Sequence, residues 1–257
     1  MLTPRIIPCL LVHKKGLVKT VRFRDPKYVG DPINAVRIFN EKQVDELMLL
    51  DIDATKEGRG PDFAMVERIA AECRMPLCYG GGVTSPDDAE HLIGLGVEKV
   101  AFGSAAIQTP QVLSQVAERL GSQSVVAVLD VKDTSSGGHI LVTHNATVAH
   151  PEPPLDMIKT LTQAGAGEMV INCVSRDGTG IGYDIPFAVQ ARLATGTPMT
   201  FLGGAGSLEH MTQLFSSVGV VGAAAGSLFV FKGKLRAVLI SYPDSTQRPC
   251  YSPNLRR

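Results

Sequence analysis

The chain has 257 residues, of which 44% are hydrophobic and 19% are charged, and its 25 basic side chains balance 25 acidic ones. A chain of this length forms either one large barrel or two ordinary domains. The balanced charge argues against an extended surface that neutralises DNA or RNA phosphates, and the hydrophobic fraction argues against intrinsic disorder. The five cysteines have spacings that suit neither a disulfide framework nor a zinc site, so we expect free thiols in a reducing compartment.

Neither a membrane span nor a signal peptide is predicted. The most apolar stretch, residues 218–231, is about 14 residues long and contains two glycines, whereas a membrane helix needs about 20 apolar residues. The N-terminal segment lacks a basic region followed by an apolar run and a cleavage site of small residues. We therefore expect a cytoplasmic protein.

Short β-rich runs alternate with amphipathic segments along the chain. The predicted strands cover residues 5–12, 45–53, 76–80, 97–103, 124–131, 167–174, 198–202 and 219–225. The predicted helices cover residues 31–43, 61–74, 85–95, 110–120, 153–164, 184–195, 206–217 and 232–241. Strand–helix alternation predicts parallel strands, and eight such units predict one closed (βα)8 TIM barrel over residues 1–242. The polar segment 243–257 is predicted to be a flexible tail.

The two halves of the chain carry similar glycine-rich segments. Residues 77–85 are followed, after a helix, by residues 97–105, and residues 201–207 are followed in the same way by residues 220–228. The offset is about 122 residues, close to half of the chain. This repeat predicts a barrel built from two similar half-barrels.

Both pairs of glycine-rich segments fall at the carboxyl ends of predicted strands, where the active sites of such barrels lie. Glycine allows backbone N–H groups to approach an anion closely. Two matched pairs predict two phosphate sites across the barrel mouth, and hence a bisphosphorylated ligand or a relative of one. The alternative is that the glycines only turn the chain.

Asp130 ends an apolar strand at the same edge of the barrel. Burial there would raise the pKa of its carboxyl group and suit it to general acid–base catalysis. The alternative role is to orient the backbone of a loop. Its counterpart in the first half-barrel is the apolar Leu11, so a symmetric acid–base pair is incomplete.

Four charged residues stand at the opposite, N-terminal ends of the predicted strands, namely Arg5, Glu46, Lys99 and Glu168. Side chains alternate along a strand, so a face that points into the active mouth also points into the barrel at its other end. The four residues are therefore predicted to form an ionic ring across the barrel floor. Buried charges are tolerated when they are paired, and the ring is interpreted as a gate, with a structural plug as the alternative.

These segments resemble the HisF family, the cyclase subunit of imidazole glycerol phosphate synthase, over residues 1–242. The matching stretches include DELMLLDIDAT, YGGGVTSPDDA, GVEKVAFGSAA and SRDGTGIGYD. The resemblance implies a (βα)8 barrel and a heterodimer with a HisH-type glutaminase at its N-terminal face. It also implies that ammonia passes through the barrel to a bisphosphorylated ribosyl-formimino aminoimidazole carboxamide, giving imidazole glycerol phosphate and an aminoimidazole carboxamide ribotide.

Site roles are implied position by position. The resemblance makes Asp130 catalytic and assigns the four charged residues of the floor to an ammonia gate. The residues predicted to bind substrate or phosphate are Lys19, Asp51, Gly82, Gly103, Ser104, Asn172, Asp177, Gly178, Gly204, Gly226 and Ser227. No cofactor, metal ion, nucleic acid or membrane is expected at the site.

The chain departs from the family pattern at several of these positions. Leu11 replaces the other catalytic aspartate, and leucine cannot donate or accept a proton. Gly103 stands where the family has asparagine, and Leu202 where it has serine.

The segments 16–55 and 224–244 resemble a HisF-like branch found in bacterial surface-polysaccharide clusters, beside a HisH-like glutaminase and an N-sugar amidotransferase. That resemblance implies the supply of ammonia for converting an acetamido group to an acetamidino group on a phosphorylated or nucleotide-linked sugar, as in O-antigen biosynthesis. Three alternatives remain open: a working cyclase of histidine biosynthesis, a non-catalytic scaffold that activates a glutaminase, and a barrel isomerase without a partner.

Overall fold

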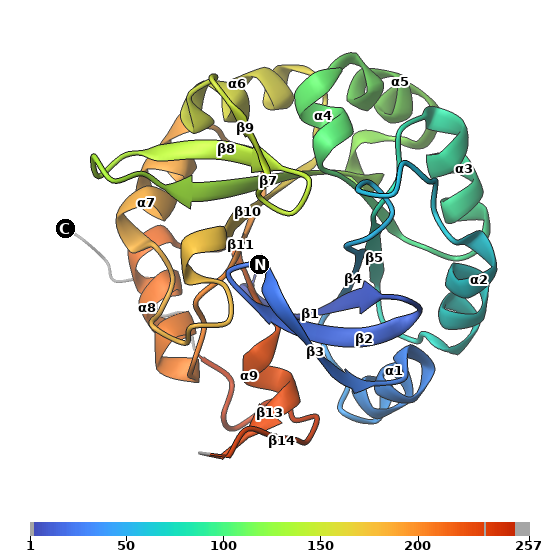
Figure 1. The fold of residues 1–257 in the computed structure, drawn as a ribbon, viewed down its shortest axis with the longest axis vertical. Helices are drawn as coiled ribbons and strands as arrows, with labels where there is room; N and C mark the ends of the chain where they lie inside the picture. Colours follow the sequence, from blue (N-terminus) through green and yellow to red (C-terminus); the bar gives the residue numbers. More distant parts are fainter. Residues whose placement is uncertain (1–2, 234, 250–257) are drawn as a thin grey trace.

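The computed structural model describes residues 3–233 and 235–249, and these form a closed barrel of parallel strands surrounded by helices (Figure 1). The order around the barrel is β10, β11, β12, β1, β4, β5, β6 and β7, and β7 pairs with β10 to close it. The barrel strands are β1 (Arg5–His13), β4 (Leu47–Asp51), β5 (Leu77–Gly80), β6 (Lys99–Phe102), β7 (Val125–Asp133), β10 (Glu168–Cys173), β11 (Met199–Leu202) and β12 (Gly222–Ala225). The predicted (βα)8 TIM barrel is confirmed.

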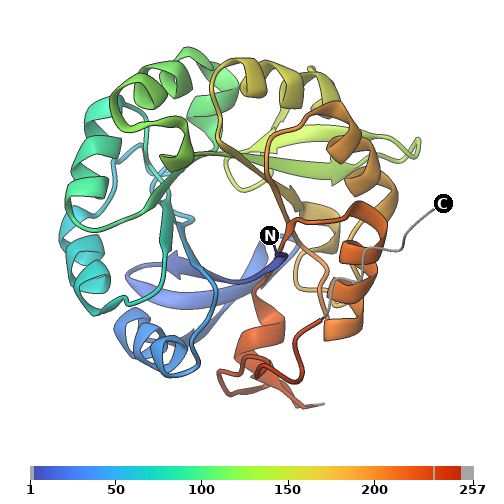
Figure 2. The ribbon, with the colours of Figure 1, turned by 180° about the vertical axis from the view of Figure 1, so that it is seen from behind.

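The helices form the outer ring of the barrel (Figure 2). They are α1 (Pro32–Glu41), α2 (Phe63–Glu72), α3 (Pro86–Gly94), α4 (Ser104–Gln108), α5 (Gln111–Leu120), α6 (Pro154–Gln163), α7 (Ile185–Ala194), α8 (Leu208–Val218) and α9 (Ser227–Val230). The sequence explains the start of α3, because Ser85 and Asp88 form a reciprocal capping box and Pro86 stands at the first helical position. Across the described ranges, none of the helices has the length and apolar character needed to cross a lipid bilayer.

The predicted helix over residues 232–241 is wrong. After α9 the chain forms two short antiparallel strands, β13 (Phe231–Lys232) and β14 (Ala237–Val238). Gly233 and Arg236 have φ angles of +72° and +50°, which a right-handed helix cannot accommodate. The apolar spacing in this segment therefore reflects a small hairpin instead of a helical face.

Two hairpins extend the barrel strands and were not predicted. The first consists of β2 (Gly16–Val21), which is antiparallel to β1, and β3 (Arg24–Gly30), which is antiparallel to β2. The second consists of β8 (His139–Thr143) and β9 (Val148–His150), which continue from β7 (Figure 1). Both leave the barrel at the carboxyl ends of their strands, so both stand beside the mouth.

The barrel interior is a separate apolar cluster, distinct from the larger core between strands and helices. Its buried members are Ile7, Cys9, Met48, Cys78, Ala101, Val126, Val128, Val170, Leu202 and Ala224. Leu11 and Leu50 pack against this cluster and lie opposite each other in the β1–β4 pairing. The interior therefore forms an uncharged core between the two ends of the barrel.

The last described segment is fastened to the first strands by Tyr242. Its hydroxyl donates a hydrogen bond to the carbonyl oxygen of Ile6 (2.9 Å) and accepts one from the backbone N–H of Asp45 (3.2 Å). Arg248 adds an ion pair of 2.6 Å to the Asp45 carboxylate. Residues 250–257 of the predicted tail lie outside the described residues.

Tyr242→Phe removes both hydrogen bonds and leaves two backbone groups without their partner. We expect the free energy of unfolding to fall by about 1–2 kcal/mol, measured by urea denaturation. Tyr28→Phe is the matched control, because Tyr28 is 66% exposed. Its replacement should change the free energy of unfolding by less than about 0.5 kcal/mol. Equal losses in the two variants would contradict the role assigned to Tyr242.

Candidate functional site

A cavity of about 400 Å³ opens at the carboxyl ends of the barrel strands. The predicted site residues that line it are Leu11, Asp51, Gly82, Gly103, Ser104, Asp130 and Asn172. Its remaining walls come mainly from the loop after β4 and from the turn between β8 and β9. The cavity is thus built from the first half-barrel, from β7 and β10, and from the turn between β8 and β9.

Asp130 lies on the cavity wall beside Asn172, its partner in the β7–β10 pairing. The Nδ2 group of Asn172 donates a hydrogen bond of 2.9 Å to Oδ1 of Asp130. Burial raises the pKa of Asp130 to about 7, although the bond from Asn172 acts in the opposite direction. The carboxyl group can therefore gain or lose a proton at neutral pH, as an acid–base catalyst must.

The surroundings of Asp130 are apolar. Leu11, Leu50 and Val128 line the same cavity. No carboxylate stands at position 11 to complete a pair with Asp130. The apolar lining also explains why the charged form of the Asp130 carboxyl is disfavoured.

Asp51 is buried, and its carboxylate already has hydrogen-bond partners within the protein. Its carboxylate accepts hydrogen bonds from the backbone N–H groups of Asp53 and Ala54, at 3.0 and 3.2 Å. It also accepts two hydrogen bonds, of 2.9 and 3.1 Å, from the guanidinium of Arg59. Asp51 therefore holds Arg59 at the cavity wall. The two parallel hydrogen bonds fix the orientation of the guanidinium group.

Of the two predicted glycine positions in the first half-barrel, only Gly82 requires glycine for a steric reason. Gly82 has a φ of +72°, and a Cβ atom there would stand 2.5 Å from the carbonyl oxygen of Arg59. Gly82 is thus required by the close approach of the loop after β4. A Cβ atom at Gly103 would meet nothing within 4 Å, so the cavity itself has room above Ser104.

Five predicted site residues of the second half-barrel do not line the cavity, namely Asp177, Gly178, Gly204, Gly226 and Ser227. Asp177, Gly178 and Gly226 contact the β2–β3 hairpin instead. Asp177 accepts a hydrogen bond of 2.8 Å from the hydroxyl of Thr20, and a Cβ atom at Gly178 would stand 2.2 Å from the carbonyl oxygen of Thr20. A Cβ atom at Gly226 would stand 2.6 Å from Nζ of Lys19. The hairpin therefore covers the second glycine-rich set.

Lys19 lies on β2 and is only 5% exposed. Its ammonium group donates a hydrogen bond to the carbonyl oxygen of Cys9. Burial lowers the pKa of Lys19, while the nearby Asp177 carboxylate acts in the opposite direction.

The last two predicted phosphate-site residues have other neighbours: Gly204 packs against the backbone of Gly182, and Ser227 accepts a hydrogen bond from Arg236.

The predicted ionic ring is present at the opposite end of the barrel. Each carboxylate of the ring pairs with both cations: Arg5 with Glu46, Arg5 with Glu168 (2.7 Å), Lys99 with Glu46 (2.8 Å) and Lys99 with Glu168 (2.9 Å). The hydroxyl of Thr200 donates a further hydrogen bond of 2.6 Å to Glu168. Although burial alone would raise it, the pKa of Glu168 is lowered by the charges of Arg5 and Lys99. The ring therefore closes as four paired charges.

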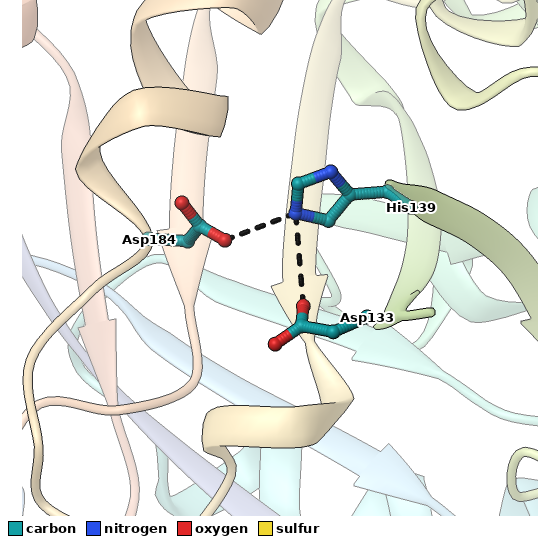
Figure 3. Close-up of side chains that lie close together, drawn as sticks. All are labelled: Asp133, His139 and Asp184. Carbon is teal, nitrogen blue, oxygen red and sulfur yellow. Dashed lines mark hydrogen bonds and ion pairs between the residues drawn. The ribbon is translucent and has the colours of Figure 1, made fainter. Parts of the chain in front are cut away.

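A second charged cluster lies outside the cavity, between β8 and α7 (Figure 3). Nε2 of His139 stands 3.0 Å from Oδ2 of Asp184 and 3.6 Å from Oδ1 of Asp133. These three side chains are spaced closely enough to hold a metal ion. However, Nε of Arg176 lies 3.8 Å from Asp184, so a cation already balances the carboxylates, and we interpret the cluster as a tether between the hairpin and α7.

The sequence matches the family model described as "Histidine biosynthesis protein" over residues 5–236. A relative from Leptospira borgpetersenii is 48% identical over 98% of this chain and 100% of its own length. Relatives from Vibrio vulnificus (strain YJ016) and Pseudomonas aeruginosa are 49% and 47% identical, over 96% and 95% of this chain. All three are provisionally named as HisF-type subunits of imidazole glycerol phosphate synthase.

This chain belongs to the HisF family. Within this HisF-type barrel, sequence reasoning missed several cavity residues that lie on loops, namely Phe23, Lys56, Arg59, His144 and Asn145. The basic residues that follow β4 were one available signal, because βα-loops carry the site in such barrels. The positions of Phe23, His144 and Asn145 depend on hairpins that the sequence did not indicate.

Asp130→Asn tests the burial of the HisF-type carboxyl group. The folded protein keeps Asp130 protonated up to about pH 7, whereas the unfolded chain ionises it near pH 4, so stability should fall as the pH rises between these values. The asparagine variant lacks this loss. We expect its stability relative to the wild type to improve by about 2–3 kcal/mol from pH 5 to pH 8, measured by urea denaturation. A pH-independent difference would show that Asp130 is ionised in the folded state.

Proposed function

We propose that this chain is a synthase subunit of HisF type that receives ammonia from a HisH-like glutaminase at its N-terminal face. The ammonia moves through the barrel and reaches an acceptor bound in the cavity. The observation that carries this proposal is the closed ionic ring of Arg5, Glu46, Lys99 and Glu168 beneath an apolar interior that ends at Asp130.

The barrel interior suits ammonia as the transported species. Ammonia is small and uncharged, whereas burying an unpaired ammonium ion is strongly unfavourable. Burial raises the pKa of Cys9 to about 11 and raises that of Cys78 as well, so both interior thiols stay neutral at physiological pH. In this proposal the ring opens by the movement of one cationic side chain, and Lys99 is that side chain.

The acceptor that we propose is a phosphorylated or nucleotide-linked sugar whose acetamido group becomes an acetamidino group. An N-sugar amidotransferase would act with the barrel in that reaction. Leu11 supports this assignment, because it removes one of the two aspartates expected of a histidine-pathway cyclase. Arg59 and Lys56 provide positive charge at the cavity for an anionic ligand.

A cyclase of histidine biosynthesis is the second candidate, and the names of the relatives favour it. The test supplies the purified protein with ammonium and the bisphosphorylated cyclase substrate and follows imidazole glycerol phosphate. We expect turnover to be lower than that of a cyclase with both aspartates by about 10²–10⁴-fold, the usual cost of losing an acid–base group. Turnover close to that of such a cyclase would overturn the proposal.

Leu11→Asp is the companion experiment in the same assay. If the missing carboxylate is what separates this chain from a cyclase, the variant should gain imidazole glycerol phosphate formation by at least about tenfold. Leu11→Asn is the matched control, because it has the same shape and cannot transfer a proton. A gain in both variants would assign the effect to polarity in place of proton transfer.

Lys99→Ala tests the gate. We expect glutamine-dependent turnover in the complex with the glutaminase to change by about tenfold or more, while ammonium-dependent turnover changes much less, because external ammonium can reach the cavity from its open side. Lys159→Ala is the control, since Lys159 is exposed on α6. Equal effects of Lys99→Ala on both reactions would indicate that the ring is only a structural plug.

A scaffold without chemistry of its own makes a different prediction. Asp130→Asn would then leave product formation by the complete complex unchanged. Under our proposal the same variant loses product formation yet still stimulates the glutaminase, because Asp130 lies at the end of the barrel opposite to the ring. The two activities can be measured in one reaction as glutamate and product.

A further inference from the structure

Few cavity groups can exchange a proton near neutral pH. The titratable residues that line the cavity in the described part of the chain are Asp51, Lys56, Arg59, Asp130 and His144. Asp51 and Arg59 bind each other, and Lys56 lies exposed at the rim. His144 is the remaining group that can both donate and accept a proton, and it is therefore the natural partner for Asp130.

The pairing of β7 with β8 places the turn that carries His144 beside the part of β7 that carries Asp130. Asp130 on β7 lies opposite Val142 on β8. His144 follows two residues later, as the first residue of the turn after β8. Both residues line the same cavity.

The turn that carries His144 has an unusual backbone. His144, Asn145 and Ala146 have φ angles of +54°, +56° and +61°, in the left-handed region that residues other than glycine rarely adopt. Three consecutive residues in this conformation store strain on the order of 1 kcal/mol each, and such strain persists where surrounding contacts impose it. The turn contains no glycine that would relieve it.

Contacts at both ends of the hairpin hold this turn over the cavity. Nδ2 of Asn145 donates a hydrogen bond of 3.0 Å to the carbonyl oxygen of Ile52, across the mouth. At the start of β8, the His139 ring is fixed to Asp184, at the beginning of α7 (Figure 3). The strained turn is therefore imposed by the rest of the molecule.

The imidazole of His144 is itself oriented. Its Nδ1 lies 3.0 Å from the hydroxyl oxygen of Thr143, which lies 2.9 Å from Nε2 of His150. Thr143 is buried, so the hydroxyl fixes one ring nitrogen of His144. No group within residues 3–233 or 235–249 makes a hydrogen bond to its Nε2, which leaves that nitrogen available to a ligand.

We propose that His144 is a catalytic residue that takes the place of the carboxylate absent at position 11. The inference rests on the proposed delivery of ammonia to an acceptor with a carbonyl-type carbon. Ammonia forms a C–N bond with that carbon, and the C=O π electrons move to the oxygen. Asp130 accepts one proton from the attacking nitrogen, and the His144 imidazolium donates one proton to the oxygen. The product of this step is a neutral hydroxy-amino adduct.

His144→Asn is the decisive variant. Asparagine can still contact the Thr143 hydroxyl and tolerates the left-handed conformation, so the turn should keep its shape. We expect kcat of the full-length protein with ammonium and its turned-over acceptor to fall by about 10²–10⁴-fold, with KM changed by less than about threefold. One limb of the pH–rate profile should also disappear. Unchanged kcat with an intact pH profile would overturn the proposal.

Ala146→Gly is the control for the turn, because Ala146 has a φ of +61° and is not a cavity residue, and glycine keeps the left-handed backbone while His144 and the bond of Asn145 to Ile52 stay in place. It should retain most of the kcat that His144→Asn loses. If both variants lose the same activity, the turn as a whole and not the imidazole would be responsible, which would contradict the catalytic role.

A measurement without turnover separates this inference from the proposed function. Nuclear magnetic resonance of the full chain with labelled histidine would follow the ring signal of His144, identified by its absence in His144→Asn, during titration with ribose 5-phosphate. We expect this signal to shift while that of His91, exposed on α3, stays in place. If the protein turns over neither the sugar acceptor nor the cyclase substrate, the proposed function has failed. A shifted His144 signal would then still show that His144 lies beside a bound ligand. An unmoved signal overturns the inference.

Discussion

The barrel depends on four buried or half-buried charges that are stable only while they are paired with one another. Leaving one partner of a buried ion pair alone costs about 3–5 kcal/mol, and in the ionic ring each carboxylate meets two cations. The ring therefore constrains the alignment of β1, β6 and β10, which carry Arg5, Lys99 and Glu168, because a slip of one residue would turn these side chains toward the helices. The same alignment places Asn172 beside Asp130 at the other end of β10.

The apolar interior links the two ends of the molecule physically. It separates the paired charges of the floor from the carboxyl group of Asp130 and lowers the polarity around both. For the ring this means weak screening of its ion pairs, and for Asp130 it means a pKa near neutrality. One property of the barrel, an uncharged lining, thus has opposite consequences for groups that are paired and for a group that is not.

Sequence reasoning succeeded where the signal was local and periodic. The alternation of strand and helix and the two-residue period that aligns Arg5 with Leu11 were sufficient to predict the barrel and the ring. Sequence reasoning failed where buried and exposed side chains do not alternate along a strand. β3 is exposed over most of its length, so no hydrophobic pattern indicated the hairpin that covers Gly226. The cavity positions of Arg59 and His144 depend on contacts between loops distant in sequence, which no local pattern encodes.

The two half-barrels are similar in sequence but not in accessibility. The β2–β3 hairpin covers the second half, and the cavity opens over the first. Among the described residues, the cavity is lined by β1, β4, β5, β6, β7 and β10 but not by β11 or β12, so a ligand there lies against an asymmetric wall. A flat acceptor held there would present a single face to the incoming nucleophile, so the asymmetric mouth would fix the stereochemistry of the addition before any catalytic group takes part.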